Sequence, residues 1–398
     1  MDAVKPVRVG IIGARGQGGF YASLVSDGQV PAMALGAMCG RSEAAGEQVR
    51  ERFGVVPYFT DPVAMITSGE VEAVIVTTPH YDHAEHAIAA LEAGLSVLVE
   101  KPLGAYTAQV ARLLDAADTE AARTPGLVAG VMLNQRANPL FARLKQVLDS
   151  GEIGRVHRAT WVITNWFRPQ SYFDSSAWRG TWGGEGGGVV LNQAVHQLDL
   201  WQWLLGAPER VFAKVGFGAG HDIHVDDDVT ATFDHGSFAG TFVTSTHDML
   251  GSDRLEIHGD QGRIVVEGSS RATVTRLRAP MRELAASLPA DEVQRIIRGT
   301  VDWSAYGTDE VFEGASEYGA DHARVLENFA RAVRFGEPLL APLSEGANSV
   351  RLANAILLSA WRGEEVPFDF ADDQYLAELN ARIRAEGRFP ERQDSGGR

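Results

Sequence analysis

A lysine at the end of a short apolar run is the residue of this sequence best placed for chemistry. Ser96–Val99 lies between Gly94 and Pro102, which is typical of a buried parallel strand, and Glu100 and Lys101 follow it. In open α/β sheets the carboxyl ends of the strands border the ligand crevice. The Lys101 ammonium is therefore a candidate to exchange a proton or to polarise a substrate oxygen. The alternative is a solvated lysine that ends an ordinary strand.

A second polar group follows three glycines at 186–188. Asn192, His196 and Asp199 recur at i, i+4 and i+7, a spacing that predicts one face of a helix. We interpret His196 as the residue that exchanges the substrate proton beside Lys101, and Asn192 and Asp199 as substrate-binding residues. The alternative is a buried network in which Asp199 satisfies the histidine.

The stretch 165–188 between these two groups is dense in aromatic and polar residues and has neither helical nor strand periodicity. Aromatic faces can cover the C–H patches of a sugar or cyclitol while polar groups bind its hydroxyls. We therefore take Trp166, Arg179 and Trp182 as substrate-binding candidates. Ordinary core aromatics are the alternative explanation.

Near the start of the chain, an apolar run over 7–12, a glycine-rich turn over 13–19 and a helical stretch over 20–27 succeed one another. This is the context that a dinucleotide-binding fingerprint requires. The second glycine of the G-x-G-x-x-G pattern is replaced by Arg15, which either shifts the pyrophosphate contact or makes its own. The candidate cofactor-binding residues of the turn are Gly13, Arg15, Gly16, Gln17 and Gly18. A glycine-rich turn that binds nothing is the alternative.

The strand expected over 34–39 ends in Gly40, Arg41 and Ser42. Sites that prefer NAD place an acid at this position to bind the ribose 2′-hydroxyl, whereas arginine and serine suit a 2′-phosphate. The sequence therefore favours NADP over NAD. An exposed Arg41 that binds no ligand is the alternative.

The loop after the strand expected over 71–77 is predicted to lie against the cofactor. Its candidate cofactor-binding residues are Thr78, Pro79 and His83, joined by Glu100 and Lys101 from the end of the next strand. His80, His83 and His86 have spacing that suits a metal, but no carboxylate or cysteine completes a recognisable ligand set. We therefore predict no metal site.

Strands and helices alternate through the first third of the chain and predict a doubly wound parallel sheet, a Rossmann domain over 1–134. Regularly spaced strand signals after 155 predict an α+β domain over 135–398 with a large open, mainly antiparallel sheet. The irregular stretch 279–314 is an expected insertion or lid. The polar tail after Glu386 is expected to be disordered.

Composition narrows the class of protein further. The 398 residues carry 36 Lys and Arg against 52 Asp and Glu, a net charge of −16, which disfavours nucleic acid and anionic membranes as partners. The single cysteine fits a reducing compartment. A strand-like run close to the first residue leaves no room for a signal peptide, and no apolar stretch is long enough to span a bilayer. We expect a cytoplasmic protein.

Taken together, several motifs resemble the glucose–fructose oxidoreductase/inositol dehydrogenase (Gfo/Idh/MocA) family. They are Gly13…Gly18, Thr78-Pro79 with His83, Glu100-Lys101-Pro102, Gly186–Gly188…Asn192…His196…Asp199, and Asn354…Ser359-Ala-Trp361. The resemblance implies NAD- or NADP-dependent oxidation or reduction of a sugar, glycoside or cyclitol carbon. It also implies a homo-oligomer, a dimer or tetramer, that uses the open sheet as its interface.

The resemblance implies an active-site lysine at Lys101, with His196 as its partner. The chain departs from the family pattern at Asn192, where aspartate is common, at His80, where asparagine is frequent, and at Arg15 and Gly40. Because an amide cannot relay a proton, we expect Asn192 to orient the substrate. Two alternatives remain: a redox-neutral enzyme that retains NAD and processes glycosides, and a nucleotide-dependent sensor without catalysis.

Overall fold

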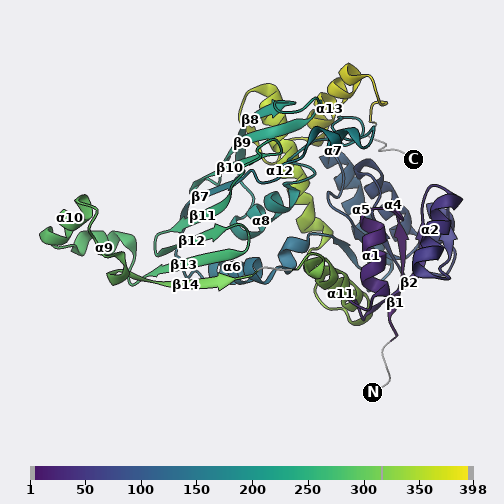
Figure 1. Cartoon of the computed structure of the whole chain (residues 1–398), viewed down its shortest axis with the longest axis horizontal. Helices are drawn as coiled ribbons and strands as arrows, with labels where there is room; N and C mark the ends of the chain where they lie inside the picture. The colour runs from purple at the N-terminus through teal and green to yellow at the C-terminus, as the bar shows by residue number, and fades with distance from the viewer. Residues whose placement is uncertain (1–4, 315–316, 393–398) are drawn as a thin grey trace.

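The computed structural model describes residues 5–314 and 317–392, so the far end of the tail expected to be disordered lies outside the described residues. Two sheets organise the chain (Figure 1). The first has six parallel strands in the order β3-β2-β1-β4-β5-β6, as predicted. Its strands are β1 (Val7–Ile12), β2 (Met33–Cys39), β3 (Tyr58–Phe59), β4 (Ala73–Val76), β5 (Ser96–Val99) and β6 (Ala129–Val131). The strand order reverses between β1 and β4, which opens a ligand crevice at their carboxyl ends.

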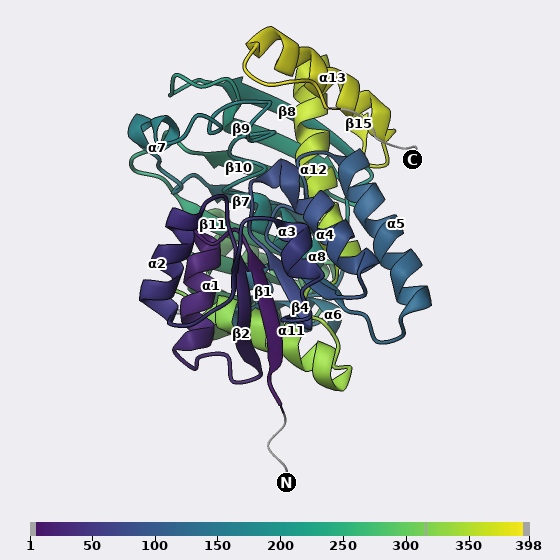
Figure 2. The same ribbon diagram turned by 90° about the vertical axis from the view of Figure 1, so that its right-hand side faces the viewer.

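Helices cover both faces of the first sheet (Figure 2). One face carries α1 (Gln17–Ser26) and α2 (Glu43–Phe53), and the other carries α3 (Pro62–Ile66), α4 (His83–Glu92) and α5 (Thr107–Arg123). From the C-terminal part, α11 (Ala320–Phe335) packs beside α1, where Leu326 and Phe329 join the core of Val9 and Tyr21. The chain therefore returns to the first sheet after 134. The boundary at 134 stays a prediction.

The second sheet has nine strands in the order β14-β13-β12-β11-β7-β10-β9-β8-β15. Its neighbours pair antiparallel except β7 and β10, which are parallel. The strands are β7 (Val156–Ile163), β8 (Arg210–Phe217), β9 (Asp226–Asp234), β10 (Ala239–Ser245), β11 (Asp253–Gly259), β12 (Gly262–Glu267), β13 (Arg271–Leu277), β14 (Gly307–Glu313) and β15 (Val366–Pro367). The predicted fold class is confirmed.

Helices pack on one face of this sheet and leave the other face open (Figure 1). They are α6 (Pro139–Asp149), α8 (Val195–Leu205) and α12 (Leu343–Arg362), with α13 (Asp372–Glu386) against α12 and α7 (Gln170–Asp174) in the loop after β7. Side chains alternate accordingly along β9, where Ala231 and Phe233 are buried and Thr230 and Thr232 are exposed.

The stretch 279–314 is more regular than expected, because it contains α9 (Met281–Ser287), α10 (Ala290–Ile297) and β14. It extends the β13–β14 hairpin and projects away from the first sheet (Figure 1). None of its described residues lines the cavity at the crevice of the first sheet. The alternative of a lid over that cavity is therefore wrong.

A buried asparagine on α12 joins the second part of the chain to the segment after Lys101. Asn354 Oδ1 accepts a hydrogen bond from the Thr107 amide at 3.0 Å, and Asn354 Nδ2 donates to the Ala105 carbonyl at 3.3 Å. These bonds satisfy backbone groups at the start of α5. The C-terminal motif thus helps to hold the segment that follows Lys101.

Candidate active site

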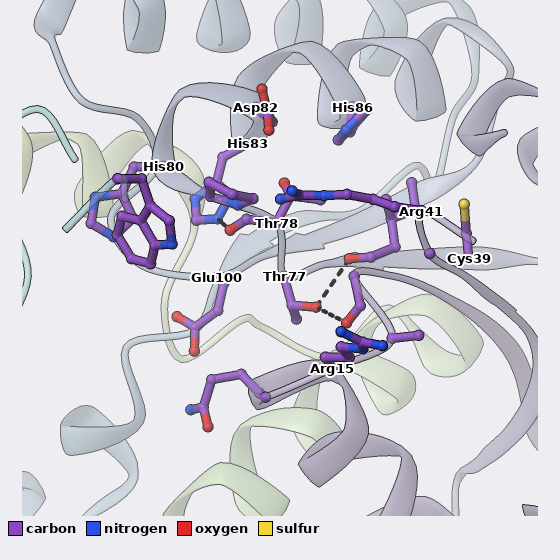
Figure 3. A pocket seen from close by; sticks show the side chains of 18 of the residues that line it. Arg15, Cys39, Arg41, Thr77, Thr78, His80, Asp82, His83, His86 and Glu100 are labelled. Atoms are coloured by element: carbon purple, nitrogen blue, oxygen red, sulfur yellow. Dashed lines mark hydrogen bonds between the residues drawn. The ribbon is translucent and has the colours of Figure 1, made fainter. Parts of the chain in front are cut away.

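A cavity of about 740 Å³ opens at the carboxyl ends of β1, β2, β4 and β5 (Figure 3). Segments on both sides of residue 134 line it. The segment before residue 134 contributes the turn after β1, the loops after β2 and β4, and the end of β5; the segment after it contributes Tyr172, Ser176, Trp178, Arg179 and Asn192. Of the predicted cofactor-binding residues, twelve line the cavity: Gly13, Arg15, Gly16, Gln17, Gly40, Arg41, Ser42, Thr78, Pro79, His83, Glu100 and Lys101.

The glycine turn brings the start of α1 to the end of β1. Gly13 has a φ of 105°, and a Cβ atom on Gly18 would lie 2.0 Å from the Gly13 carbonyl oxygen. Gly18 therefore allows this close approach without lining the cavity itself. Thr77 Oγ1 holds the turn by donating to the Ile12 and Gly13 carbonyls at 3.0 and 2.9 Å (Figure 3). The amides at the start of α1 face the cavity and suit a phosphate.

The loop after β2 carries Arg41 and no acid at its first position, and Arg15 of the glycine turn lines the same cavity. Arg15 and Arg41 are exposed, and neither forms an ion pair within the part of the chain that the structure describes. Gly40 leaves room for Tyr58, because a Cβ atom there would lie 2.5 Å from the Tyr58 hydroxyl. Ser42 caps α2, and its side chain accepts from the Ala45 amide at 3.4 Å.

His83 links the loops that follow β4 and β5. Its Nδ1 lies 2.6 Å from the Pro102 carbonyl and its Nε2 lies 2.6 Å from the Thr78 carbonyl. Burial lowers the pKa of His83, and the two carbonyls oppose that shift. Both ring nitrogens are engaged, so His83 positions the loops. Thr78 Oγ1, by contrast, is buried with no partner among the described residues and is left to a ligand.

Lys101 reaches from the end of β5 to the turn before α8. Its Nζ donates to the Asn192 carbonyl at 2.8 Å and lies 3.5 Å from Asn192 Oδ1. The Lys101–Pro102 peptide bond is cis. Burial lowers the pKa of Lys101 despite the opposing charges of Glu100 and Glu185. A lysine with a lowered pKa releases and takes up a proton more readily at neutral pH.

Glu100 supports Lys101 from its own backbone position. The carboxylate accepts a hydrogen bond from the Tyr21 hydroxyl at 2.6 Å and another from the Lys101 amide. It is 5% exposed, so these bonds hold the end of β5 in one arrangement.

Glu185 is one of the site residues that sequence reasoning missed, with Tyr172 and Trp178. Its Oε1 accepts from Asn192 Nδ2 at 2.5 Å and its Oε2 accepts from the Gly180 amide at 2.7 Å. The side chain is 1% exposed, and burial raises its pKa to about 7. The structure thus places a carboxyl group beside Asn192, next to the position where the family pattern has aspartate. The sequence signal was an acid flanked by glycines shortly before the apolar run 189–191.

The raised pKa of Glu185 predicts a pH-dependent contribution to stability. The unfolded carboxyl titrates near 4.5 and the folded one near 7, so the folded state binds the proton more tightly. This contribution is complete below pH 4.5 and is lost as the pH rises through 7, by about 3 kcal/mol at most. Glu185→Gln removes it, so the variant should be more destabilised at about pH 5 than at about pH 8 in urea unfolding. Equal destabilisation at both pH values, or the same trend in Glu209→Gln at an exposed site, would contradict this.

The expectation that one helix face carries Asn192, His196 and Asp199 is wrong. Helix α8 begins at Val195, and Asn192 lies in the turn before it. The carboxylate of Asp226 holds this turn by accepting from the Gly188 and Val190 amides at 2.6 and 2.9 Å. Asn192 therefore reaches the cavity from a turn of its own.

Asp199 is not at the cavity. Its carboxylate binds the Arg136 guanidinium through two hydrogen bonds of 2.8 and 2.7 Å, and Gln202 Nε2 donates to it at 3.0 Å. Asp199 and Arg136 are each 1% exposed. The structure therefore gives Asp199 a buried ion pair and leaves it no contact for a substrate.

His196 lies next to the cavity without lining it. Its Nδ1 is buried with no hydrogen-bond partner among the described residues. Burial, together with the charge of Lys101 and with His322 from α11, holds the pKa of His196 well below its usual range. The imidazole is therefore neutral at physiological pH. Because His322 lies far along the chain from His196, local sequence does not predict that α11 contributes to this region.

The aromatic stretch divides between the cavity and the core. Trp182 is 5% exposed and packs on Trp361, with ring centroids 5.3 Å apart, and Trp166 also packs against the core. Neither lines the cavity, whereas Arg179 does, between Tyr172 and Trp178. The predicted stretch therefore does contribute to the cavity, but through Arg179 and not through Trp166 or Trp182.

Two further properties of the described residues bear on function. They contain no group of three or more His, Cys, Asp and Glu side chains arranged to hold a metal ion. Their helices include none with the length and apolar character needed to cross a membrane.

Comparison with known proteins gives two family matches. The model described as "Oxidoreductase family, NAD-binding Rossmann fold" matches residues 7–124, and the model "GFO/IDH/MocA C-terminal domain" matches residues 141–265. A myo-inositol 2-dehydrogenase of Thermotoga maritima is 26% identical over 280 residues, which cover 67% of this chain and 77% of that protein. A levoglucosan dehydrogenase of Pseudarthrobacter phenanthrenivorans is 27% identical over 352 residues, covering 80% of this chain and 85% of that protein.

A solved structure supports the same fold. A levoglucosan dehydrogenase in complex with NADH and levoglucosan superposes with a TM-score of 0.75 at 22% identity. The match covers 92% of this chain and 100% of that one. At this identity the likeness shows the fold alone.

Proposed function

The chain belongs to the Gfo/Idh/MocA family of oxidoreductases, and from this premise we propose that it transfers a hydride between NADP and a hydroxyl or keto carbon of a sugar, glycoside or cyclitol. The relatives named above as inositol and levoglucosan dehydrogenases support this substrate class. One observation carries the proposal. The Lys101 ammonium, held by the Asn192 carbonyl, lies in the same cavity as the glycine turn that suits a dinucleotide.

The described residues fit a dinucleotide. The glycine turn leaves the start of α1 open to the cavity for a pyrophosphate, and the buried Thr78 hydroxyl lacks a protein partner. The nicotinamide cofactor supplies the hydride acceptor or donor when it is bound. The protein then has to hold the substrate, exclude water and move one proton.

We assign that proton to Lys101 Nζ. Burial already lowers the pKa of Lys101, so its neutral form can accept the proton of a substrate hydroxyl, and its charged form can return it in the reverse direction. The neutral His196 beside it adds no competing charge. Asn192 Oδ1 faces Nζ at 3.5 Å because Glu185 holds the Asn192 amide nitrogen. Glu185 therefore positions Asn192, which orients Lys101 and the substrate.

The loop after β2 supports the preference for NADP. Position 40 carries no acid to select the 2′-hydroxyl, and the Tyr58 hydroxyl would lie 2.5 Å from a Cβ atom there. Arg15 and Arg41 line the cavity and are free to bind a 2′-phosphate. The nearby acid Asp61 is engaged at the start of α3, where its side chain accepts from the Val63 amide at 3.0 Å.

Replacing Arg41 with alanine tests this preference. Loss of a charged hydrogen bond to the 2′-phosphate should raise the KM for NADP by about 10- to 100-fold and leave the KM for NAD nearly unchanged. Arg50→Ala, on the exposed surface of α2 away from the cavity, is the matched control. An equal effect on both cofactors, or none on NADP, would remove Arg41 from the proposal.

The proposed reaction is tested by following reduction of NADP and NAD in parallel with inositols, aldoses and glycosides. Reduction of NADP with one of these classes supports the proposal. Glycoside turnover without net reduction, with a nucleotide that survives desalting, would favour the redox-neutral alternative. Nucleotide binding without turnover of any compound would favour the sensor.

We also propose a homo-oligomer built on the open face of the nine-stranded sheet. Large apolar side chains are exposed on its strands, including Phe212 at 48% and Val311 at 47%. Light scattering of the purified protein should therefore give the mass of a dimer or tetramer. A monomer at micromolar concentration would overturn this part of the proposal.

A further inference from the structure

We propose that the substrate carries an oxyanion, a carboxylate or phosphate group on its polyhydroxylated ring, and that Arg179 binds it. This inference rests on the proposed function and specifies the class of its substrate. It predicts that the chain discriminates between charged and neutral members of one sugar series.

The guanidinium of Arg179 is held ready at the cavity wall. Its central carbon lies 4.2 Å from the ring centroid of Tyr172 and 4.5 Å from that of Trp178, and Nη1 donates to the Tyr172 hydroxyl. Two aromatic contacts fix the plane of a guanidinium and reduce the entropy lost when it binds a ligand. The Arg179 side chain is thus preorganised to bind the oxyanion.

Arg179 also has unused hydrogen-bonding capacity. Its Nε is buried and has no partner among the described residues. A buried donor without an acceptor costs free energy, which a ligand can recover. The planar guanidinium offers parallel donors that match the two oxygens of a carboxylate or phosphate.

The charges around Arg179 leave room for an anion. Arg168 lies at this end too, because its guanidinium carbon is 5.4 Å from the ring centroid of Tyr172. The charges of Arg168 and Arg179 lower the pKa of Lys101, which lines the same cavity as Arg179. Among the described residues, no carboxylate oxygen lies within 4 Å of the charged nitrogens of these three side chains. The neighbouring His80 adds no charge, because its pKa is lowered to about 3, chiefly by burial, which leaves the imidazole neutral.

Two of the acids near Arg179, Glu185 and Asp174, are hydrogen-bonded to other groups. The carboxyl of Glu185 is bonded to Asn192 and to the Gly180 amide, and its raised pKa of about 7 leaves it partly neutral. Asp174 borders a smaller neighbouring cavity with Arg179, where Gln170 Nε2 donates to it at 3.0 Å. Neither acid neutralises Arg179, so a substrate anion would be its counter-ion.

The position of Arg179 points to the substrate and not to the cofactor. The elements that suit phosphate, the glycine turn with Arg15 and the loop with Arg41, belong to the six-stranded parallel sheet. Arg179 comes from the segment between β7 and α8, as do Trp178 and Asn192, which also line the cavity. A carboxylate or phosphate bound there would lie within the substrate.

The experiment compares binding of D-glucose, D-glucuronate and D-glucose 6-phosphate, and of the matching galactose series, to the protein with NADP by calorimetry. In the wild type, at least one charged member should bind about tenfold or more tightly than its neutral parent, and added salt should weaken that preference. The carboxylate and phosphate arms show which oxyanion is bound. Arg179→Met, which keeps most of the apolar stem, should abolish the preference, whereas Arg50→Met on the exposed surface of α2 should keep it.

Neutral sugars that bind as tightly as charged ones, no binding of any charged member, or an unchanged preference in Arg179→Met would each overturn the inference. Its failure differs from that of the proposed function. Reduction of NADP by neutral sugars alone leaves the proposed function intact and removes the oxyanion. Tight binding of a charged sugar without any hydride transfer supports the oxyanion and removes the proposed reaction.

Discussion

Replacing Lys101 with methionine is expected to lower kcat by about 10²- to 10⁴-fold, the range of a general acid–base contribution. Methionine is about as long as lysine and resembles its apolar stem, but it has no proton to exchange. The structure leaves the glycine turn and the Thr78 hydroxyl untouched by this change, so the affinity for NADP should stay within about twofold of the wild type. The measurement is steady-state turnover with the best substrate of the panel, together with calorimetric titration of NADP.

Lys145→Met is the matched control for this experiment. Lys145 lies on α6 and pairs with Asp149 outside the cavity, so its loss should leave turnover unchanged. Normal turnover in Lys101→Met would remove the lysine from the proton pathway. Loss of NADP binding together with turnover would instead assign Lys101 to holding the cofactor.

Replacing Asp199 with asparagine is expected to destabilise the protein by about 3–5 kcal/mol. The change keeps the shape of the side chain but leaves the buried Arg136 guanidinium without its main counter-charge, and breaking a buried ion pair by removing one partner has a cost of this size. Glu345 also contacts Arg136, but its side chain is 51% exposed and offsets only part of the loss. The free energy of unfolding in urea measures the effect.

A double replacement separates this ion pair from a substrate contact. The double variant Arg136→Met with Asp199→Leu removes both charges and leaves neither one buried without its partner. It should therefore be more stable than the single variant Asp199→Asn, although the single variant changes fewer atoms. A raised KM in Asp199→Asn with unchanged stability would restore Asp199 as a substrate-binding residue. Lower stability with an unchanged KM for the folded fraction is the outcome that the structure predicts.

Local patterns in the sequence were sufficient for the elements that surround the cofactor. Apolar runs that end in glycine or proline predict the parallel strands, because a strand buried on both faces has no polar alternation. The glycine turn and Lys101 follow their strands directly, so their place at the carboxyl edge of the sheet is already determined by chain order. The residues predicted to bind the cofactor accordingly line one cavity, apart from Gly18 behind it.

The substrate side of the cavity was decided by contacts between residues far apart in the chain. Asn192 reaches the cavity because Asp226, 34 residues later, binds the turn before α8, and Asp199 leaves it because Arg136, 63 residues earlier, takes its carboxylate. No helical periodicity encodes such partners. Glu185 likewise acquires its raised pKa only through burial in the folded chain. Local sequence therefore determined which segments carry the chemistry, and the tertiary structure decided which side chains of those segments face the substrate, because long-range ion pairs and burial set their direction and charge.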